Sequence, residues 1–263
     1  MNLGLEDKRV LVTGSTSGIG EGIARRFAQE GATAIVNGRN RDAAERVAAE
    51  IRGDDGRAIL AMGDLSLDEE VARIVETVQS ELGGVDILVN NAASGEHQND
   101  METDAAGWLD SYNTNVLSMV RLIQRLLRPM QERGWGRIIN ISSAAAVNPS
   151  PGMGVYATTK AAVNTLTVTL AQAMKGENVT INTVSPGAII TEKMIGMGPE
   201  YGLGDTREEI IAAFDGMADS TPFNRMGRVE EIADVVVFLA SPRASYIHGA
   251  NIRVDGGWVP TTN

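Results

Sequence analysis

The chain has 263 residues, of which 43% are hydrophobic and 22% are charged, and this composition is that of a globular protein long enough for one large α/β domain. Its net charge of −11 makes nucleic acids and anionic membrane surfaces poor partners, and no apolar run is long enough to span a bilayer. There is no cysteine and there are only two histidines, His97 and His248, so we exclude disulfides, thiolate nucleophiles and His-rich metal sites and expect no metal.

Short runs rich in Val and Ile alternate with longer segments of helical period. The predicted strands are Arg9–Thr13, Thr33–Asn37, Arg57–Met62, Asp86–Asn90, Arg137–Ser142, Thr180–Ser185 and Asn251–Val254. The predicted helices are Ile19–Glu30, Arg41–Arg52, Leu67–Leu82, Asp104–Arg133, Val155–Lys175 and Val229–Ala240. Continuously apolar strands that alternate with helices indicate a parallel sheet covered on both faces. We therefore expect a doubly wound, Rossmann-type α/β fold with seven strands, in one domain that spans residues 1–263.

A glycine-rich turn, TGSTSGIG, follows the first predicted strand and runs directly into a helix. Its glycines, Gly14, Gly18 and Gly20, allow the backbone to turn sharply and to approach a pyrophosphate. The N-terminus of the helix adds unpaired N–H groups and the positive end of its dipole. A tight turn without a ligand is the alternative, but the position after the first strand favours a dinucleotide phosphate site.

The second predicted strand ends in Val36-Asn37-Gly38-Arg39. A site specific for NAD usually carries an acid here to bind the ribose 2′-hydroxyl, and that acid would repel a 2′-phosphate. An arginine binds a 2′-phosphate instead, so Arg39 predicts NADP (NADPH) as the cofactor, with NAD less favoured. The alternative is a solvated Arg39 that opens the next helix, and Arg41 either assists it or is merely exposed.

Two further polar positions follow the third and fourth predicted strands, where ligands lie in open α/β sheets. Asp64 either accepts a hydrogen bond from the adenine amino group or caps the loop before the helix at Leu67. The segment Asn90-Asn91-Ala92 ends the fourth strand and faces the same crevice.

The candidate catalytic residues follow the fifth predicted strand. Ser142 and Ser143 end that strand, while Tyr156 and Lys160 lie four residues apart near the start of the next helix and therefore share one helix face. A free tyrosine titrates near pH 10, and a close ammonium lowers its pKa enough for proton exchange near neutrality. A serine hydroxyl can hold the substrate oxygen while the proton moves.

The segment from Pro186 to about Arg228 is long, broken by glycines and rich in large apolar residues. We interpret residues 187–228 as a substrate lid rather than a misread core element. Met194, Met197 and Phe214 are candidate walls of a pocket for a hydrophobic ketone or alcohol. The alternative is that these three residues pack the lid onto the core.

In sequence order, TGSTSGIG, NNAA, Asn115, ISS, Y-x-x-x-K, SPG and VDGG resemble the motifs of the short-chain dehydrogenase/reductase family, in its single-domain branch. The resemblance covers nearly the whole chain. It implies an oxidoreductase that interconverts a ketone and a secondary alcohol by hydride transfer, and that forms homodimers or homotetramers. The absence of cysteine suits a location in the reducing cytoplasm. The assembly would use Val116–Leu127, Ala161–Leu170 and the C-terminal strand, although their apolar residues are equally compatible with packing against the sheet.

The resemblance also implies roles for individual residues. Tyr156 would be the general acid/base, Ser143 (or Ser142) would orient the carbonyl, and Lys160 would lower the pKa of the tyrosine and bind the nicotinamide ribose. Asn115, which nothing else in the sequence selects, would hold a water in the proton relay. The implied cofactor contacts are Gly14, Ser17, Gly18, Ile19, Gly20, Arg39, Asp64, Leu65, Asn91, Ala92, Tyr156, Lys160, Pro186, Gly187, Ile189 and Thr191.

Two positions depart from the family pattern. Ala93 replaces the glycine of the usual N-N-A-G, and Ser17 stands where some NADP-dependent members carry a basic residue.

A 3-oxoacyl-[acyl-carrier-protein] reductase is the second interpretation. Such enzymes resemble one another in a pair of basic residues that docks the acidic carrier protein. Here Arg133 fits the first position, but Glu177 stands at the second, and the net charge of the chain disfavours an acidic carrier. A non-catalytic NADP-binding sensor is a third, disfavoured by the intact Ser143, Tyr156 and Lys160. A hydrolase is excluded because the chain has no nucleophile elbow.

Overall fold

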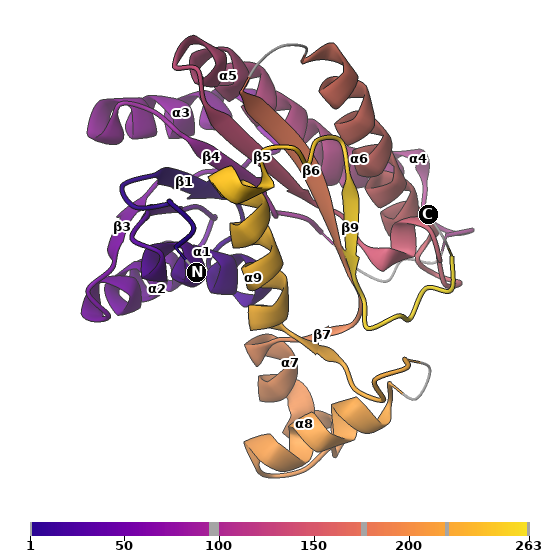
Figure 1. Ribbon diagram of the computed structural model, residues 1–263. Coiled ribbons are helices and arrows are strands. Elements are labelled where there is room, and N and C mark those ends of the chain that lie inside the picture. Colours follow the sequence, from indigo (N-terminus) through magenta and orange to yellow (C-terminus); the bar gives the residue numbers. More distant parts are fainter. Residues whose placement is uncertain (1, 95–99, 175–177, 219–220, 262–263) are drawn as a thin grey trace.

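A computed structural model describes residues 2–94, 100–174, 178–218 and 221–261 (Figure 1). Seven parallel strands form the central sheet in the order β3-β2-β1-β4-β5-β6-β9, which confirms the predicted fold class. These strands are β1 (Arg9–Val12), β2 (Thr33–Val36), β3 (Arg57–Leu60), β4 (Ile87–Asn90), β5 (Gly136–Ile141), β6 (Val179–Pro186) and β9 (Asn251–Val254). The strand order reverses between β1 and β4, so the carboxyl ends of these two strands frame the crevice in which a ligand is expected.

Helices cover both faces of the sheet (Figure 1). One layer contains α1 (Gly18–Gln29), α2 (Arg41–Gly53) and α9 (Val229–Ala240), and the other contains α3 (Asp68–Leu82), α5 (Ser118–Glu132) and α6 (Gly154–Ala173). Alternate residues of each strand supply the two cores: Val10 and Val12 pack under α1, while Leu11 belongs to the core under α3 and α5. The strands are apolar on both faces for this reason, as the sequence predicted.

One predicted helix, Asp104–Arg133, is divided in the structure. It consists of α4 (Ala105–Tyr112), a π-helical turn at Asn113–Leu117, and then α5. A π-helical turn widens the backbone by one residue per turn and re-aims the side chains within it. The buried Asn115 lies in this turn and is hydrogen-bonded to Ser94 and Thr159, outside the helix, so the break is accompanied by long-range contacts that the periodicity of the sequence does not report. The predicted end of the following helix, Lys175, lies outside the described residues.

The segment 187–228 carries regular structure that was not predicted from the sequence. It contains β7 (Ile189–Ile190), α7 (Glu192–Met197), a 3-10 turn at Gly198–Tyr201, α8 (Arg207–Gly216) and β8 (Gly227–Arg228). β7 and β8 pair in parallel as a separate two-stranded sheet, and the two helices project beyond the carboxyl end of the main sheet (Figure 1). Shorter 3-10 turns lie at Ala144–Ala146 and Pro242–Ala244.

The segment 187–228 has an apolar cluster of its own. Ile190, Ile195 and Ile210 are buried together, and Phe214 packs against them. Phe214 was expected to line a substrate pocket or to pack a lid onto the main core, and in the structure it packs within the segment 187–228 instead. Met194 and Met197 stay partly exposed.

Candidate active site

The glycine-rich turn packs closely against the end of β4. Gly14 and Gly18 have φ of +61° and +57°, which L side chains rarely adopt. A Cβ atom on Gly14 would lie 2.9 Å from the Cα atom of Ala92, and one on Gly20 would lie 2.5 Å from Nδ2 of Asn91. The turn therefore needs its glycines so that its backbone can pack closely against Asn91 and Ala92, and this packing places the turn at the N-terminus of α1, where a pyrophosphate is expected to bind.

Hydrogen bonds lock the ends of β1 and β4 together. Nδ2 of Asn91 donates to the carbonyl oxygens of Thr13 and Gly14 at 2.9 and 3.2 Å, and the hydroxyl of Thr13 accepts the N–H groups of Asn91 and Ala92, both at 2.9 Å. Thr13 was not singled out from the sequence. Ala93, which replaces the usual glycine, is exposed and does not have a positive φ, so its methyl group meets no backbone conflict.

A crevice of about 430 Å³ opens over these strand ends. It brings together most of the predicted cofactor contacts. Its lining includes Gly14, Ser17, Ile19, Gly20, Arg39, Asp64, Leu65, Asn91 and Ala92. Residues from β1, β2, β3 and β4 thus meet at one edge of the sheet, as parallel strands dictate.

Arg39 lies at the rim of this crevice with 80% of its side chain exposed, and its Nη1 atom is 3.6 Å from Oδ2 of Asp64. Asp64 also accepts the N–H of Ser66 at 2.8 Å. Hydrogen bonding from Ser66, more than the charge of Arg39, holds the pKa of Asp64 below its usual value. Asp64 therefore caps its loop and faces the crevice, so its two interpretations are compatible. Arg41 pairs with Glu45 at 3.5 Å on the surface of α2.

The two serines after β5 have different surroundings. The hydroxyl of Ser142 is buried and donates to the carbonyl oxygen of Lys160 at 3.0 Å, which ties α6 to β5. The hydroxyl of Ser143 accepts the N–H of Ala145 and is hydrogen-bonded with Tyr156. The structure thus brings Ser143, and not Ser142, to the tyrosine.

Lys160 is buried beside Tyr156 with only 1% of its surface exposed. Its Nζ atom donates to the carbonyl oxygen of Ile141 at 2.8 Å and lies 5.5 Å from the centre of the tyrosine ring. Burial lowers the pKa of Lys160 to about 8. Burial also raises the pKa of Tyr156, against a hydrogen bond with Ser143 that lowers it. Desolvation of the phenol therefore outweighs this hydrogen bond, and a lowering of the tyrosine pKa by Lys160 stays a prediction.

Asn115 is buried and contacts the helix that carries Tyr156 and Lys160. Its Oδ1 atom accepts the N–H of Ser94 at 2.8 Å, and its Nδ2 atom donates to the carbonyl oxygen of Ser94 and to the hydroxyl of Thr159, both at 3.0 Å. Thr159 precedes Lys160, so Asn115 connects the π-helical turn to the helix that carries Tyr156 and Lys160.

The segment Pro186–Thr191 adjoins the glycine-rich turn. Gly187 donates its N–H to Val254 at 3.0 Å, and a Cβ atom on Gly187 would lie 2.8 Å from the Cα atom of Asp255. Thr191 caps α7, and its Cγ2 atom would be 3.6 Å from a Cβ atom on Gly18. Ile189 is buried in β7. The predicted nicotinamide segment and the predicted pyrophosphate turn are therefore neighbours.

Sequence reasoning missed Asp100, whose carboxylate accepts the N–H groups of Gly152 and Val155 at the N-terminus of α6. Its only sequence signal, an isolated acid, is too common to be informative. Arg133, the first residue of the proposed carrier-docking pair, lies 3.8 Å from Asp86 and donates to the carbonyl oxygen of Val85, at the amino end of β4. Glu177 and His97 lie outside the described residues.

The described part of the chain holds neither a candidate metal site nor a candidate membrane span. No group of three or more His, Asp or Glu side chains there is arranged to hold a metal ion. No helix there is long and apolar enough to cross a membrane.

Comparison with known proteins gave matches along nearly the entire chain. A family model described as enoyl-(acyl carrier protein) reductase matches residues 14–259. The chain is 40% identical over 260 residues to an uncharacterized oxidoreductase of Bacillus subtilis strain 168, with 98% of each chain covered. L-sorbose reductase from Gluconobacter frateurii, solved with NADPH and L-sorbose, has a TM-score of 0.92 at 35% identity and covers 99% of this chain and 100% of its own. A 7 alpha-hydroxysteroid dehydrogenase solved with NADH has a TM-score of 0.86 at 34% identity and covers 100% of this chain and 98% of its own.

Proposed function

We propose that this chain, which belongs to the short-chain dehydrogenase/reductase family, is an NADP(H)-dependent oxidoreductase that interconverts a ketone and a secondary alcohol. The observation that carries the proposal is the convergence of Ser143, Tyr156 and Lys160 after β5, in a fold that also forms a crevice lined by the glycine-rich turn. The whole chain, residues 1–263, would act as one unit, with residues 187–228 as its lid.

Each catalytic residue has a role that its surroundings support. The nicotinamide, when bound, supplies or accepts the hydride. Ser143 holds the substrate oxygen, and Tyr156 donates a proton to that oxygen in reduction or removes one in oxidation. Lys160, held by the carbonyl of Ile141, places a positive charge near the phenol and reaches the nicotinamide ribose. Asn115 braces the helix through Thr159 and positions a water for proton exchange.

The preference for NADP rests on Arg39. The sequence after β2 reads Asn37-Gly38-Arg39 and has no carboxylate that would repel a 2′-phosphate. The side chain of Arg39 is exposed at the rim of the crevice, and among the described residues its ion pair is with Asp64, at 3.6 Å. A 2′-phosphate, with two charges and three acceptor oxygens, competes effectively for such a guanidinium.

For the substrate we propose a hydrophobic ketone or its alcohol. Met194 and Met197 of α7 support this, since both are partly exposed on the lid that follows the nicotinamide segment. Flexible thioether side chains adapt to apolar ligands of different shapes. Phe214 is not proposed as a pocket wall, because it packs against Ile190, Ile195 and Ile210.

The test is a spectrophotometric assay of NADPH oxidation with a panel of apolar ketones, ketoses and charged ketoacids. We expect Tyr156→Phe to reduce kcat by about 100- to 10,000-fold while cofactor binding is retained, because only the proton donor is lost. Tyr246→Phe is the control, since Tyr246 is fully exposed. A Tyr156→Phe variant with wild-type turnover would contradict the catalytic role, and preference for charged ketoacids would contradict the apolar substrate.

Two other functions remain as alternatives. A 3-oxoacyl-[acyl-carrier-protein] reductase agrees with the description of the matching family model, but Arg133 is already engaged by Asp86 and Val85, and this limits its use for docking an acidic carrier. Turnover of an acyl-carrier substrate exceeding that of all free ketones would favour this alternative. A non-catalytic NADP-binding sensor would be favoured by tight NADPH binding with no turnover across the panel.

We place the enzyme in the cytoplasm, because a chain without any cysteine needs no oxidising compartment. The proposed partners are a small carbonyl or alcohol substrate and further copies of the same chain, not nucleic acid or membrane.

A further inference from the structure

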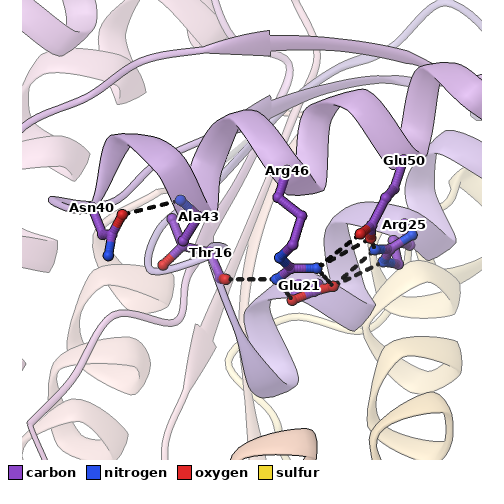
Figure 2. Close-up of polar contacts among 7 residues, drawn as sticks. All are labelled: Thr16, Glu21, Arg25, Asn40, Ala43, Arg46 and Glu50. Atoms are coloured by element: carbon purple, nitrogen blue, oxygen red, sulfur yellow. Dashed lines mark hydrogen bonds and ion pairs between the residues drawn. The ribbon is translucent and has the colours of Figure 1, made fainter.

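Four charged side chains join α1 to α2 beside the glycine-rich turn (Figure 2). Arg46 of α2 donates to both carboxylate oxygens of Glu21 of α1, at 3.0 and 2.7 Å, and also pairs with Glu50 at 3.1 Å. Arg25 of α1 pairs with the same two acids, at 2.9 Å from Glu21 and closely with Glu50. Two cations and two anions therefore neutralise one another inside this cluster.

Arg46 also contacts the glycine-rich turn directly. Its Nη2 atom donates to the carbonyl oxygen of Thr16 at 3.3 Å (Figure 2). The first half of the turn is held elsewhere, since Ser15 donates its N–H to Asn37 at 2.9 Å and its hydroxyl to Val12 at 2.7 Å. Arg46 therefore extends this anchoring to the half of the turn that leads into α1.

The position of Thr16 matters for the crevice as a whole. A Cβ atom on Gly38 would lie 2.6 Å from Cγ2 of Thr16, so the turn packs directly against the residue that precedes Arg39. Thr16, Gly38 and Arg39 all line the same crevice. A displacement of Thr16 would consequently change the shape of the pyrophosphate site.

Glu21 fixes the guanidinium of Arg46. Only 17% of the Glu21 side chain is exposed, whereas 47% of Arg46 is. Burial alone would raise the pKa of Glu21, but hydrogen bonds from Arg46 and Arg25 overcome it and hold this pKa below its usual value. The carboxylate thus stays ionised close to a phosphate site, and the two arginines offset its charge.

We propose that Arg46, anchored by Glu21, is a positioning residue that holds the glycine-rich turn in the conformation that binds the cofactor pyrophosphate. The inference rests on the proposed cofactor site. The charge of Arg46 is already used by two carboxylates, so it acts on the turn and not on the 2′-phosphate. Because NADPH and NADH share the pyrophosphate, Arg46 affects both cofactors alike, whereas Arg39 discriminates between them.

The first experiment is a fluorescence titration with NADPH and with NADH. Arg46→Met is expected to raise both dissociation constants by about tenfold and to leave their ratio unchanged. The reason is that the variant loses the charge-assisted hydrogen bonds of Arg46 to Thr16 and Glu21, which are partly exposed. Arg46→Lys is expected to recover part of both losses. The matched control is Arg52→Ala on the same helix. Arg52 also donates to a backbone carbonyl oxygen, that of Ala58, but this contact lies far from the glycine-rich turn. Arg52→Ala should therefore change neither dissociation constant.

The second experiment needs no cofactor. Hydrogen–deuterium exchange of the free protein should be faster in the segment 13–21 of Arg46→Met, and unchanged there in Arg52→Ala. If Arg46→Met weakened the binding of NADPH but not that of NADH, Arg46 would be a ligand of the 2′-phosphate, and the proposal would be overturned. Unchanged exchange in the segment 13–21 would also overturn it. If the wild-type protein binds neither nucleotide, the proposed function fails, and the exchange result still decides whether Arg46 holds the turn.

Discussion

At the residue scale, the chemistry of the site depends on how deeply two titratable groups are buried. Lys160 is shielded from solvent and its pKa falls to about 8, while burial raises the pKa of Tyr156. Both shifts have the same cause, because a low-dielectric environment disfavours each charged form. The two groups therefore respond to pH in a way that exposed side chains would not.

Ketone reduction should lose rate as the pH rises through about 8. Below this value Lys160 carries its proton and Tyr156 is protonated and able to donate; above it the ammonium that stabilises the emerging phenolate is lost. The measurement is kcat/KM for reduction between pH 6 and pH 10, corrected for the stability of NADPH. Lys160→Arg keeps the charge without this titration and should remove the decline near pH 8. A wild-type rate that stays level to pH 9.5 would show that Lys160 does not control the reaction.

The proposed preference for NADPH depends on Arg39. Its truncation in Arg39→Ala should weaken NADPH binding by about 10- to 100-fold, because a charge-assisted contact with the 2′-phosphate is lost, and should leave NADH binding unchanged. Isothermal titration with both cofactors measures this. Arg57→Ala removes an exposed arginine at the opposite end of β3, where Arg57 pairs with Asp7, and serves as the control. Equal effects on both cofactors would make Arg39 a general contact and return NAD to consideration.

At the scale of elements, α1 connects the cofactor site to the rest of the layer. It packs along α9, and Gly22 makes this approach possible, since a Cβ atom there would overlap Cγ1 of Val229. The same helix begins at the glycine-rich turn. Close packing of α1 against α9 therefore helps to fix the position of the glycine-rich turn, from which α1 begins.

Two glycine substitutions should separate packing from helix propensity. Gly22→Ala should lower the free energy of unfolding by about 1–3 kcal/mol, because the overlap with Val229 outweighs the better helix propensity of alanine. Gly53→Ala, at the end of α2, meets nothing within 4 Å and should be neutral or stabilising by up to about 1 kcal/mol. Urea denaturation of both variants tests this. Equal stability of the two would mean that α9 yields to the added methyl group.

At the scale of the whole molecule, most of the apolar surface of the two long helices is used within the chain. Leu122, Ile123 and Leu126 of α5 are buried against the sheet, as is Val163 of α6. Val168 on α6 remains 50% exposed, and Leu117 in the π-helical turn is also exposed. These exposed side chains are candidates for association between copies.

We expect the protein to be a homotetramer or homodimer in solution. Sedimentation equilibrium should give two or four times the mass of one chain, and Val168→Asp should lower that mass by placing a charge in the contact. Tyr201→Asp adds the same charge to an exposed position on the lid and should have no effect. A monomeric wild-type protein would exclude this assembly.

Local patterns in the sequence were sufficient to predict the sheet, its coverage on both faces and most of the cofactor crevice. The seven strands are short apolar runs, and the pyrophosphate turn is marked by glycines whose conformations no other residue adopts easily. Parallel strands place their carboxyl ends at one edge, so Arg39, Asp64 and Asn91 were expected to meet there, and they do.

Contacts between distant segments decided the rest. The choice of Ser143 over Ser142 depends on which hydroxyl is consumed by the backbone of Lys160, and the direction of the Tyr156 pKa depends on burial. The π-helical turn at Asn115 and the link from Arg46 to Thr16 have no sequence signature, whereas α8 begins with a capping box, Thr206 to Glu209, that the sequence analysis did not use. The physical reason is that burial, desolvation and hydrogen-bond partners are set by residues far apart in the chain, whereas sequence periodicity reports only which residues are near one another along it.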